Sequence, residues 1–138
     1  MKELNIEAKQ ENLEIVKAFV NEELEKISCP PEYLIQIDIA VEELFVNIAH
    51  YAYDNRIGMA TVLIEVFSDP GRVEITLMDK GVPYDPLQHK DPDLSLDTLD
   101  RPIGGLGIFI VKESMDYVSY QYRDGKNILS IQKKLNDG

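Results

Sequence analysis

Four short strand-like segments limit the fold most strongly, because they form two pairs that are each joined by a short turn. β-Branched and aromatic residues that alternate on both sides of such turns are typical of β-hairpins. The paired segments are residues 61–67 with 72–78 and residues 117–122 with 127–133, around the turns Asp69-Pro70-Gly71 and Asp124-Gly125. Residues 2–7 alternate as well and predict a further short strand. We therefore expect a mostly antiparallel sheet.

Two stretches before the first hairpin have helical periodicity instead. Residues 9–27 and 31–53 each carry an apolar stripe, and Pro30-Pro31 separates them, because proline is favoured in the first turn of a helix. The stripes are Leu13, Val16, Val20, Leu24 and Ile27, then Leu34, Ile37, Val41, Leu44, Ile48 and Tyr51. A third helix is expected through residues 108–114. The expected class is α+β, a two-layer α/β sandwich with helices on one face of the sheet.

Length and charge narrow the classes of function. The 138 residues suit one domain with one core, residues 1–138. The formal net charge of −11 repels nucleic acid, which is bound chiefly by Lys and Arg. The single cysteine, Cys29, permits no internal disulfide and has no evident histidine partner for catalysis, which fits a reducing cytoplasm. No apolar run approaches the roughly 20 residues of a membrane span. We expect a soluble, cytoplasmic protein.

The second helix offers a carboxylate and an amide on one face. Glu43 and Asn47 are four residues apart and so lie one turn apart. An Asn oxygen can be the single protein ligand of Mg²⁺, which takes its other ligands from water and phosphates. A Glu one turn earlier can accept a proton from a nucleophile, whereas Glu42 projects from another side of the helix. Taken alone, such a pair is more often a solvated helix surface.

Asp79 follows the strand 72–78 directly, and Gly81 allows a tight backbone turn two residues later. A carboxylate at that point can accept a hydrogen bond from an exocyclic amine such as that of adenine. Taken alone, the pattern also describes an ordinary Asp-x-Gly turn at the end of a strand.

Gly104-Gly105-Leu106-Gly107 precedes the third helix. Backbone N–H groups at a helix N-terminus bind phosphate oxygens, and glycines leave them accessible. Arg101 could reach a terminal phosphate or be an exposed cation, and the glycine run could equally be a hinge. The long proline- and aspartate-rich segment before it, about 83–103, indicates a lid or a disordered loop. The two histidines, His50 and His89, have no neighbouring His or Cys and predict no transition-metal site.

The three segments together, in this order, resemble the GHKL (histidine-kinase-like) ATPase superfamily, and within it the anti-sigma factor serine/threonine kinases. VEELFVNIAHYAY resembles the N box, LMDKGVPYDP the G1 box and GGLGIFIVKESMD the G2 box. The resemblance covers nearly the whole chain. It implies the histidine-kinase-like ATPase fold, with ATP and Mg²⁺ as ligands.

The resemblance also implies roles for individual residues. Asn47 corresponds to the Mg²⁺ ligand, Glu43 to the general base, and Asp79 with Gly81 to the adenine-reading pair. The residues that correspond to the phosphate-binding segment are Gly104, Gly105, Leu106 and Gly107, with Arg101 before them and residues 85–103 as the ATP lid. The chain departs from the family pattern in two places. The His-x-Tyr pattern that usually follows the Asn is shifted, because His50 and Tyr51 stand three and four residues after Asn47. The C-terminal strand also lacks an evident threonine.

Three functions remain open at this point. The first is a protein serine/threonine kinase that phosphorylates an anti-anti-sigma (STAS) protein and sequesters a sigma factor, as a homodimer by resemblance. The second is a regulatory binding module whose lid responds to ATP with little or no phosphoryl transfer. Service to another phosphorelay partner is a third reading. The chain itself lacks the dimerisation helices and phosphoacceptor histidine of a histidine kinase.

Overall fold

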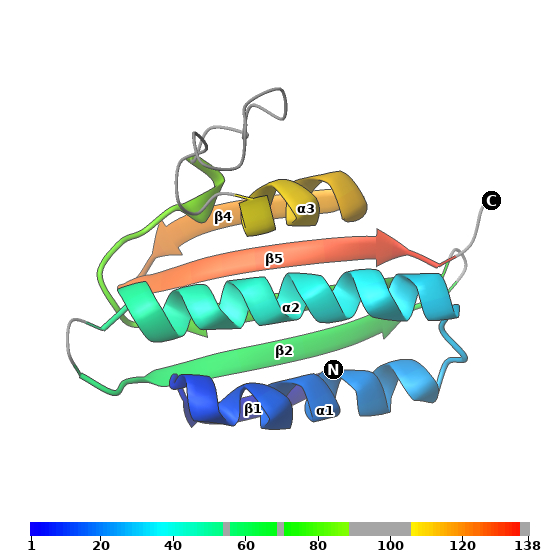
Figure 1. The fold of residues 1–138 in the computed structure, drawn as a ribbon, viewed down its shortest axis with the longest axis horizontal. Coiled ribbons are helices and arrows are strands. Elements are labelled where there is room, and N and C mark those ends of the chain that lie inside the picture. The colour runs from blue at the N-terminus through cyan, green and yellow to red at the C-terminus, as the bar shows by residue number, and fades with distance from the viewer. Residues whose placement is uncertain (54–55, 69–70, 89–105, 136–138) are drawn as a thin grey trace.

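The computed structural model describes residues 1–53, 56–68, 71–88 and 106–135 (Figure 1). These residues form five strands, three α-helices and two short 3-10 turns. The strands are β1 (Lys2–Glu7), β2 (Met59–Phe67), β3 (Arg72–Asp79), β4 (Tyr117–Arg123) and β5 (Lys126–Lys134); the helices are α1 (Leu13–Glu25), α2 (Pro31–Tyr51) and α3 (Leu106–Ser114); the 3-10 turns are Gln10–Asn12 and Pro86–Gln88. The predicted order of strands and helices is confirmed.

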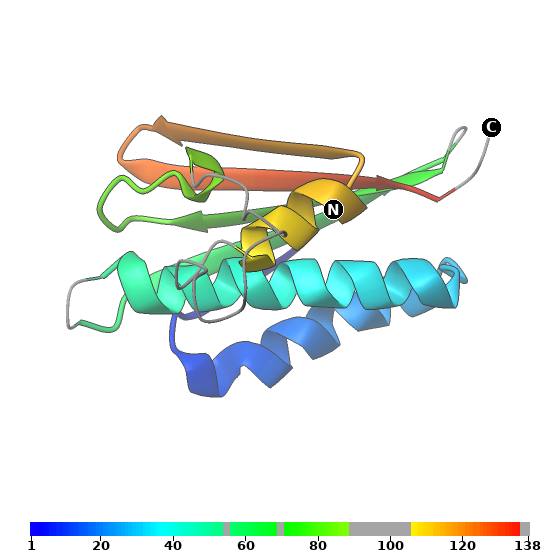
Figure 2. The ribbon, with the colours of Figure 1, turned by 45° about the horizontal axis from the view of Figure 1, so that its top comes forward.

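The strands form one antiparallel sheet in the order β1-β2-β3-β5-β4. Helices α1, α2 and α3 all lie on the same face of this sheet (Figures 1 and 2). The expected α+β class, with a two-layer sandwich, is therefore confirmed. Because β5 pairs with β3, the C-terminal hairpin brings residues 126–134 beside residues 72–79. This neighbourhood builds one wall of the site described below.

The turn between β4 and β5 shows why its sequence is such a strong signal. Asp124 and Gly125 have φ values of 55° and 76°. Positive φ at both central residues defines a type I′ turn, which matches the twist of a hairpin and favours Asp-Gly. The predicted second hairpin is thus confirmed with its turn.

The core lies between the helices and the sheet and contains most of the predicted stripes. Val16, Val20 and Leu24 of α1 are buried, as are Ile37, Val41 and Leu44 of α2. Helix α2 also buries Ala40 and Phe45 completely, beyond the predicted stripe. The wider buried arc arises because α2 contacts both α1 and α3 in addition to the sheet.

Tyr51 is a correction to the predicted stripe, because its side chain is 54% exposed. It is the last residue of α2, and its ring stacks on Tyr84 with 5.2 Å between ring centroids. At the end of the helix, the loop after β3 offers a nearer aromatic partner than the core does.

The first helix is shorter than predicted at both ends. A 3-10 turn at Gln10–Asn12 precedes it, and Ser28 beyond its end takes a positive φ of 53°. The Cys29 N–H donates back to the Leu24 carbonyl at 3.3 Å, which satisfies one of the last helical carbonyls. Across the part of the chain that the structure describes, no helix combines the length and apolar character needed to cross a bilayer.

Candidate functional site

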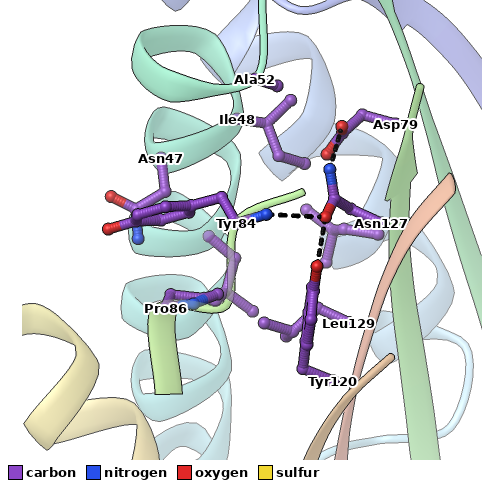
Figure 3. A pocket seen from close by; sticks show the side chains of 11 residues that line it. Asn47, Ile48, Ala52, Asp79, Tyr84, Pro86, Tyr120, Asn127 and Leu129 are labelled. Carbon is purple, nitrogen blue, oxygen red and sulfur yellow. Dashed lines mark hydrogen bonds between the residues drawn. The ribbon is translucent and has the colours of Figure 1, made fainter. Parts of the chain in front are cut away.

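A cavity lies between α2 and the sheet, beside the end of β3 (Figure 3). Its walls come from α2, from β3, β4 and β5, and from the segment after β3, so distant parts of the sequence meet there. The lining residues are Leu44, Asn47, Ile48, Ala52, Leu77, Asp79, Tyr84, Pro86, Tyr120, Asn127 and Leu129. A mostly apolar lining with a few convergent polar groups is typical of small-molecule sites.

Asp79 is the buried acid of this cavity, with 6% of its surface exposed. Its Oδ1 accepts hydrogen bonds from the Gly81 N–H at 2.8 Å and from Asn127 Nδ2 at 2.9 Å. Burial raises the pKa of the Asp79 carboxyl, and these two donors oppose that rise. Both of these hydrogen bonds use Oδ1, so within the described residues Oδ2 is the oxygen available to a ligand. The position suits the predicted acceptor for an exocyclic amine.

Asn127 is a site residue that the sequence did not reveal. It lies directly opposite Asp79 in the register of β3 and β5, and its side chain is buried. Besides Asp79, it bonds to the Val82 carbonyl at 2.8 Å, the Tyr84 N–H at 3.1 Å and the Tyr120 hydroxyl. The available signal was its place just after the Asp-Gly turn, which fixes the hairpin register. It occupies the strand in which no threonine was evident.

Gly81 approaches α2 more closely than any other residue type could. A Cβ atom at this position would overlap the backbone of Ala52, which caps the C-terminal end of α2. The Val82 N–H donates to the Ala52 carbonyl at 2.9 Å. Gly81 therefore joins the turn after β3 to the end of α2, while its N–H holds Asp79 Oδ1.

Glu43 and Asn47 lie on the side of α2 that faces the site. Asn47 lines the cavity together with Asp79 (Figure 3). The Glu43 carboxylate lies against Gly107, because a Cβ atom there would overlap its Cδ and Oε2 atoms. The predicted pair is thus placed between the cavity and the first turn of α3.

Glu42, the neighbouring carboxylate, lies elsewhere. Its Oε1 is 3.2 Å from Lys17 Nζ of α1, and the same ammonium is 3.2 Å from Asp38 Oδ2. The two carboxylates raise the pKa of Lys17, chiefly through hydrogen bonding. Glu42 therefore takes part in the contact between α1 and α2, and it points away from Asn47, as predicted.

The predicted phosphate-binding segment is described only at its end. Helix α3 begins at Leu106, and Gly107 lies in its first turn. Arg101, Gly104, Gly105 and the lid residues from 89 to 103 lie outside the described residues. The structure thus places Gly107 beside Glu43 and leaves the other members of the segment as predictions.

Two aromatic rings close the outer side of the cavity. Tyr84 lines it, and its ring stacks on Tyr51 at an interplanar angle of 29°. Burial is the main cause that raises the pKa of the Tyr84 hydroxyl, and nearby acidic groups including Glu43 add to it. The flanking residue His50 makes an edge contact with Tyr51, and its Nε2 lies 3.4 Å from Gln10 Oε1. His50 therefore contacts the end of α2 and the 3-10 turn before α1.

Asn47 is a cavity residue whose side-chain oxygen fits Mg²⁺ as a single protein ligand. Within residues 1–53, 56–68, 71–88 and 106–135, no cluster of three His, Cys, Asp or Glu side chains could hold a metal ion alone. Asn47 offers one neutral oxygen at the cavity wall, which suits an ion that takes most of its ligands from phosphates and water.

Cys29 is buried against Pro30, and burial raises the pKa of its thiol, which leaves it unreactive.

Comparison with known proteins gives a consistent result across the chain. A family model described as "Histidine kinase-like ATPase domain" matches residues 6–133. A serine-protein kinase RsbW from Bacillus licheniformis is 31% identical over 143 residues, which cover 97% of this chain and 85% of that protein. A serine-protein kinase RsbW from Bacillus cereus is 27% identical over 145 residues, which cover 99% and 89%.

A solved structure has a similar fold. The crystal structure of the RsbU and RsbW domains of a Mycobacterium tuberculosis protein superimposes with a TM-score of 0.68 at 16% sequence identity. The match covers 98% of this chain and 33% of that longer chain. At this identity the likeness supports the fold alone.

Proposed function

The chain belongs to the histidine kinase-like ATPase family, in the branch of the RsbW serine-protein kinases, and from this premise we propose how its site works. We propose that it binds Mg²⁺-ATP in the cavity beneath α2 and transfers the γ-phosphoryl group to a serine or threonine of a partner protein. The observation that carries the proposal is the joint placement of Asp79 and Asn47 in one cavity, with Glu43 against Gly107.

Each residue has a defined part in this mechanism. Asp79 Oδ2 accepts a hydrogen bond from the adenine amine, and the apolar walls enclose the base. The Asn47 oxygen would hold Mg²⁺, which would neutralise negative charge on the phosphates. Glu43 orients the incoming hydroxyl and accepts its proton at the carboxylate. Because phosphoryl transfer depends mainly on positioning and electrostatics, these few groups are sufficient.

The phosphate-binding segment completes the site. By the family resemblance, the N–H groups of residues 104–107 would bind the phosphates, and Arg101 would approach the terminal phosphate. Residues 85–103 would correspond to the lid; residues 89–105 lie outside the described part of the chain. The contact between Glu43 and Gly107 supports this arrangement, because it puts the proposed general base, the Glu43 carboxylate, beside the segment that would hold the phosphates.

The partners follow from the family. We propose that the acceptor is an anti-anti-sigma protein of the STAS type, that the unengaged protein sequesters a sigma factor, and that the active form is a homodimer. A sigma factor as partner implies a cytoplasmic location. The acidic net charge of −11 supports a role in protein binding rather than direct contact with DNA.

The test is γ-phosphoryl transfer to a STAS-domain protein from the same genome. Glu43→Ala should abolish transfer and retain Mg²⁺-ATP binding, because Glu43 acts on the hydroxyl. Glu42→Ala is the matched control: it removes the adjacent carboxylate, which pairs with Lys17, and should retain near-normal transfer. Tight ATP binding without transfer to any candidate acceptor would favour the nucleotide-gated binding module instead. Loss of ATP binding in Glu43→Ala would contradict its role as base.

A further inference from the structure

Every hydrogen-bonding position of the Asn127 side chain is used inside the protein. Its Nδ2 donates to Asp79 Oδ1 and to the Val82 carbonyl. Its Oδ1 accepts from the Tyr84 N–H and from the Tyr120 hydroxyl. An Asn amide has two N–H donors and two acceptor positions, so these four bonds exhaust it. Although Asn127 lines the cavity, it has nothing left to offer a ligand.

The network fixes the carboxylate beside it. Asn127 and Gly81 both donate to Oδ1 of Asp79, which determines the rotation of the carboxylate about its bond to Cβ. Figure 3 shows the amide of Asn127 pointing at Asp79 from β5 while the Tyr120 hydroxyl and the Tyr84 N–H approach its oxygen. The second oxygen, Oδ2, is thereby presented as an acceptor.

We infer that Asn127 is a positioning residue that makes the cavity select 6-aminopurines over 6-oxopurines, by aiming one Asp79 oxygen at the 6-position of the base. This inference rests on the proposed function, in which the cavity binds the base of a nucleotide. A 6-amino group donates a hydrogen bond to a carboxylate. A 6-oxo group is itself an acceptor and meets the carboxylate oxygen with repulsion.

Asn127 also ties the cavity wall to the same unit. Its bonds to the Val82 carbonyl and the Tyr84 N–H hold the segment that carries the Tyr84 ring. Loss of the amide therefore frees Asp79 and the aromatic wall together. A merely structural residue would change stability or overall affinity without changing the choice between two bases.

The experiment compares Mg²⁺-ATP with Mg²⁺-ITP by calorimetry, because the two nucleotides share their phosphates and differ at position 6. The wild type should prefer ATP by about 100-fold or more, since sites built around a hydrogen bond reject analogues that lack it. Asn127→Ala should reduce this preference by about tenfold or more, mainly through weaker ATP binding. Tyr120→Phe removes a single bond to the Asn127 oxygen and should cause a smaller loss of preference.

Ser130→Ala is the matched control. Ser130 lies on the same strand, but its hydroxyl lies 3.0 Å from that of Thr76, away from the cavity. This variant should retain the wild-type ratio of affinities. Circular dichroism checks that each variant folds. If Asn127→Ala does not fold, Asn127→Leu decides, because leucine has a similar volume and no hydrogen-bonding group, and the preference should again fall.

The outcomes separate this inference from the proposed function. A wild type that prefers ATP, with the same preference in Asn127→Ala or, if needed, in Asn127→Leu, would overturn the role of Asn127 and leave the proposed function intact. A wild type that binds ATP and ITP equally would overturn the inference together with the proposed contact between Asp79 and the adenine amine, and would leave nucleotide binding and phosphoryl transfer intact. A wild type that binds neither nucleotide would overturn both.

Discussion

At the scale of single residues, identical side chains differ in role because they differ in environment. Glu42 and Glu43 are adjacent, yet one pairs with Lys17 of α1 and the other lies against Gly107 of α3. Asn47 lines the cavity as a potential ligand, whereas Asn127 is fully occupied by the protein. The type of a residue therefore indicates which side chains could act in the site, and the contacts of each side chain show which of them are placed to do so.

Asp79→Asn should weaken ATP binding without lowering the stability of the fold. Burial raises the pKa of Asp79 above 3.8, so the folded state holds this proton more tightly than the unfolded state. The buried charge therefore lowers the free energy of unfolding at neutral pH, and this cost fades as the pH falls through the raised pKa. The variant keeps an oxygen for Asn127, so its denaturant-derived stability should equal or exceed that of the wild type. Its ATP affinity should fall by about tenfold or more.

Asp116→Asn is the control for that variant. Asp116 also accepts a backbone hydrogen bond, from the Lys134 N–H at 2.7 Å, but it is exposed and does not line the cavity. Its ATP affinity should match the wild type. Unchanged ATP affinity in Asp79→Asn would remove Asp79 from base recognition.

Gly107→Ala should displace the Glu43 carboxylate, which is the proposed general base. The added Cβ overlaps the end of the flexible Glu43 side chain, which can move, so the melting temperature should change little. Phosphoryl transfer at saturating ATP should fall by about 100-fold, because the carboxylate no longer lies where the hydroxyl is expected. Stopped-flow or radiolabel transfer assays provide the measurement. A variant with a normal rate of transfer would show that the contact between Glu43 and Gly107 has no catalytic importance.

At the scale of elements, α2 organises the site. Its buried side packs on the core through residues such as Phe45, while its exposed end carries Tyr51 to the aromatic contact with Tyr84. Between them, Asn47 faces the cavity. The position of α2 relative to β3 is set where Gly81 meets Ala52, because that contact joins the end of the helix to the turn after the strand.

Gly81→Ala should loosen this junction. The new Cβ would overlap backbone atoms of Ala52, which cannot move without shifting α2. We expect a loss of about 1–3 kcal/mol in the free energy of unfolding, as for other overpacked sites. Urea titration measures it, with Lys80→Ala, an exposed neighbour, as a control that should stay within about 0.5 kcal/mol. Equal stability of the two variants would mean that the junction tolerates a methyl group.

At the scale of the whole molecule, the acidic field and the nucleotide oppose each other. A chain with net charge −11 repels a polyanion, so binding depends on local backbone dipoles and on a divalent cation. Metal and nucleotide are therefore expected to bind, and to stabilise the fold, together.

Mg²⁺-ATP should raise the melting temperature of the protein. At 100 times the dissociation constant, the expected gain is about 2.7 kcal/mol, which corresponds to roughly 10 °C for a domain of this size. Chelation by EDTA in the presence of ATP should remove most of the rise, since in the proposed mechanism Asn47 would act on the nucleotide only through Mg²⁺. Asn47→Ala with Mg²⁺ should behave like the wild type with EDTA. A rise that is insensitive to both changes would contradict the role of Asn47.

The sequence by itself determined the elements and their class. Hydrophobic periodicity distinguishes helix from strand locally, and the Asp-Gly turn between β4 and β5 is read from two residues because few residue types accept positive φ. The three glycine- and acid-bearing segments and their order also indicated the family. These features are local or linear in the chain, so they can be read without knowing which segments meet.

Only the tertiary structure decided which side chains share an environment. Asn127 lies 48 positions after Asp79, and the Asp-Gly turn before it gives the register of its own hairpin but not its partner in β3, which is set only when β5 pairs with β3. The spacing of Tyr51 fits the buried stripe, yet its side chain is exposed at the end of α2. Its ring packs on the ring of Tyr84 and not in the core. The contact of Glu43 with Gly107 likewise depends on how α3 packs on α2. Hydrogen bonds and steric contacts act over a few ångströms in space, whatever the separation along the chain.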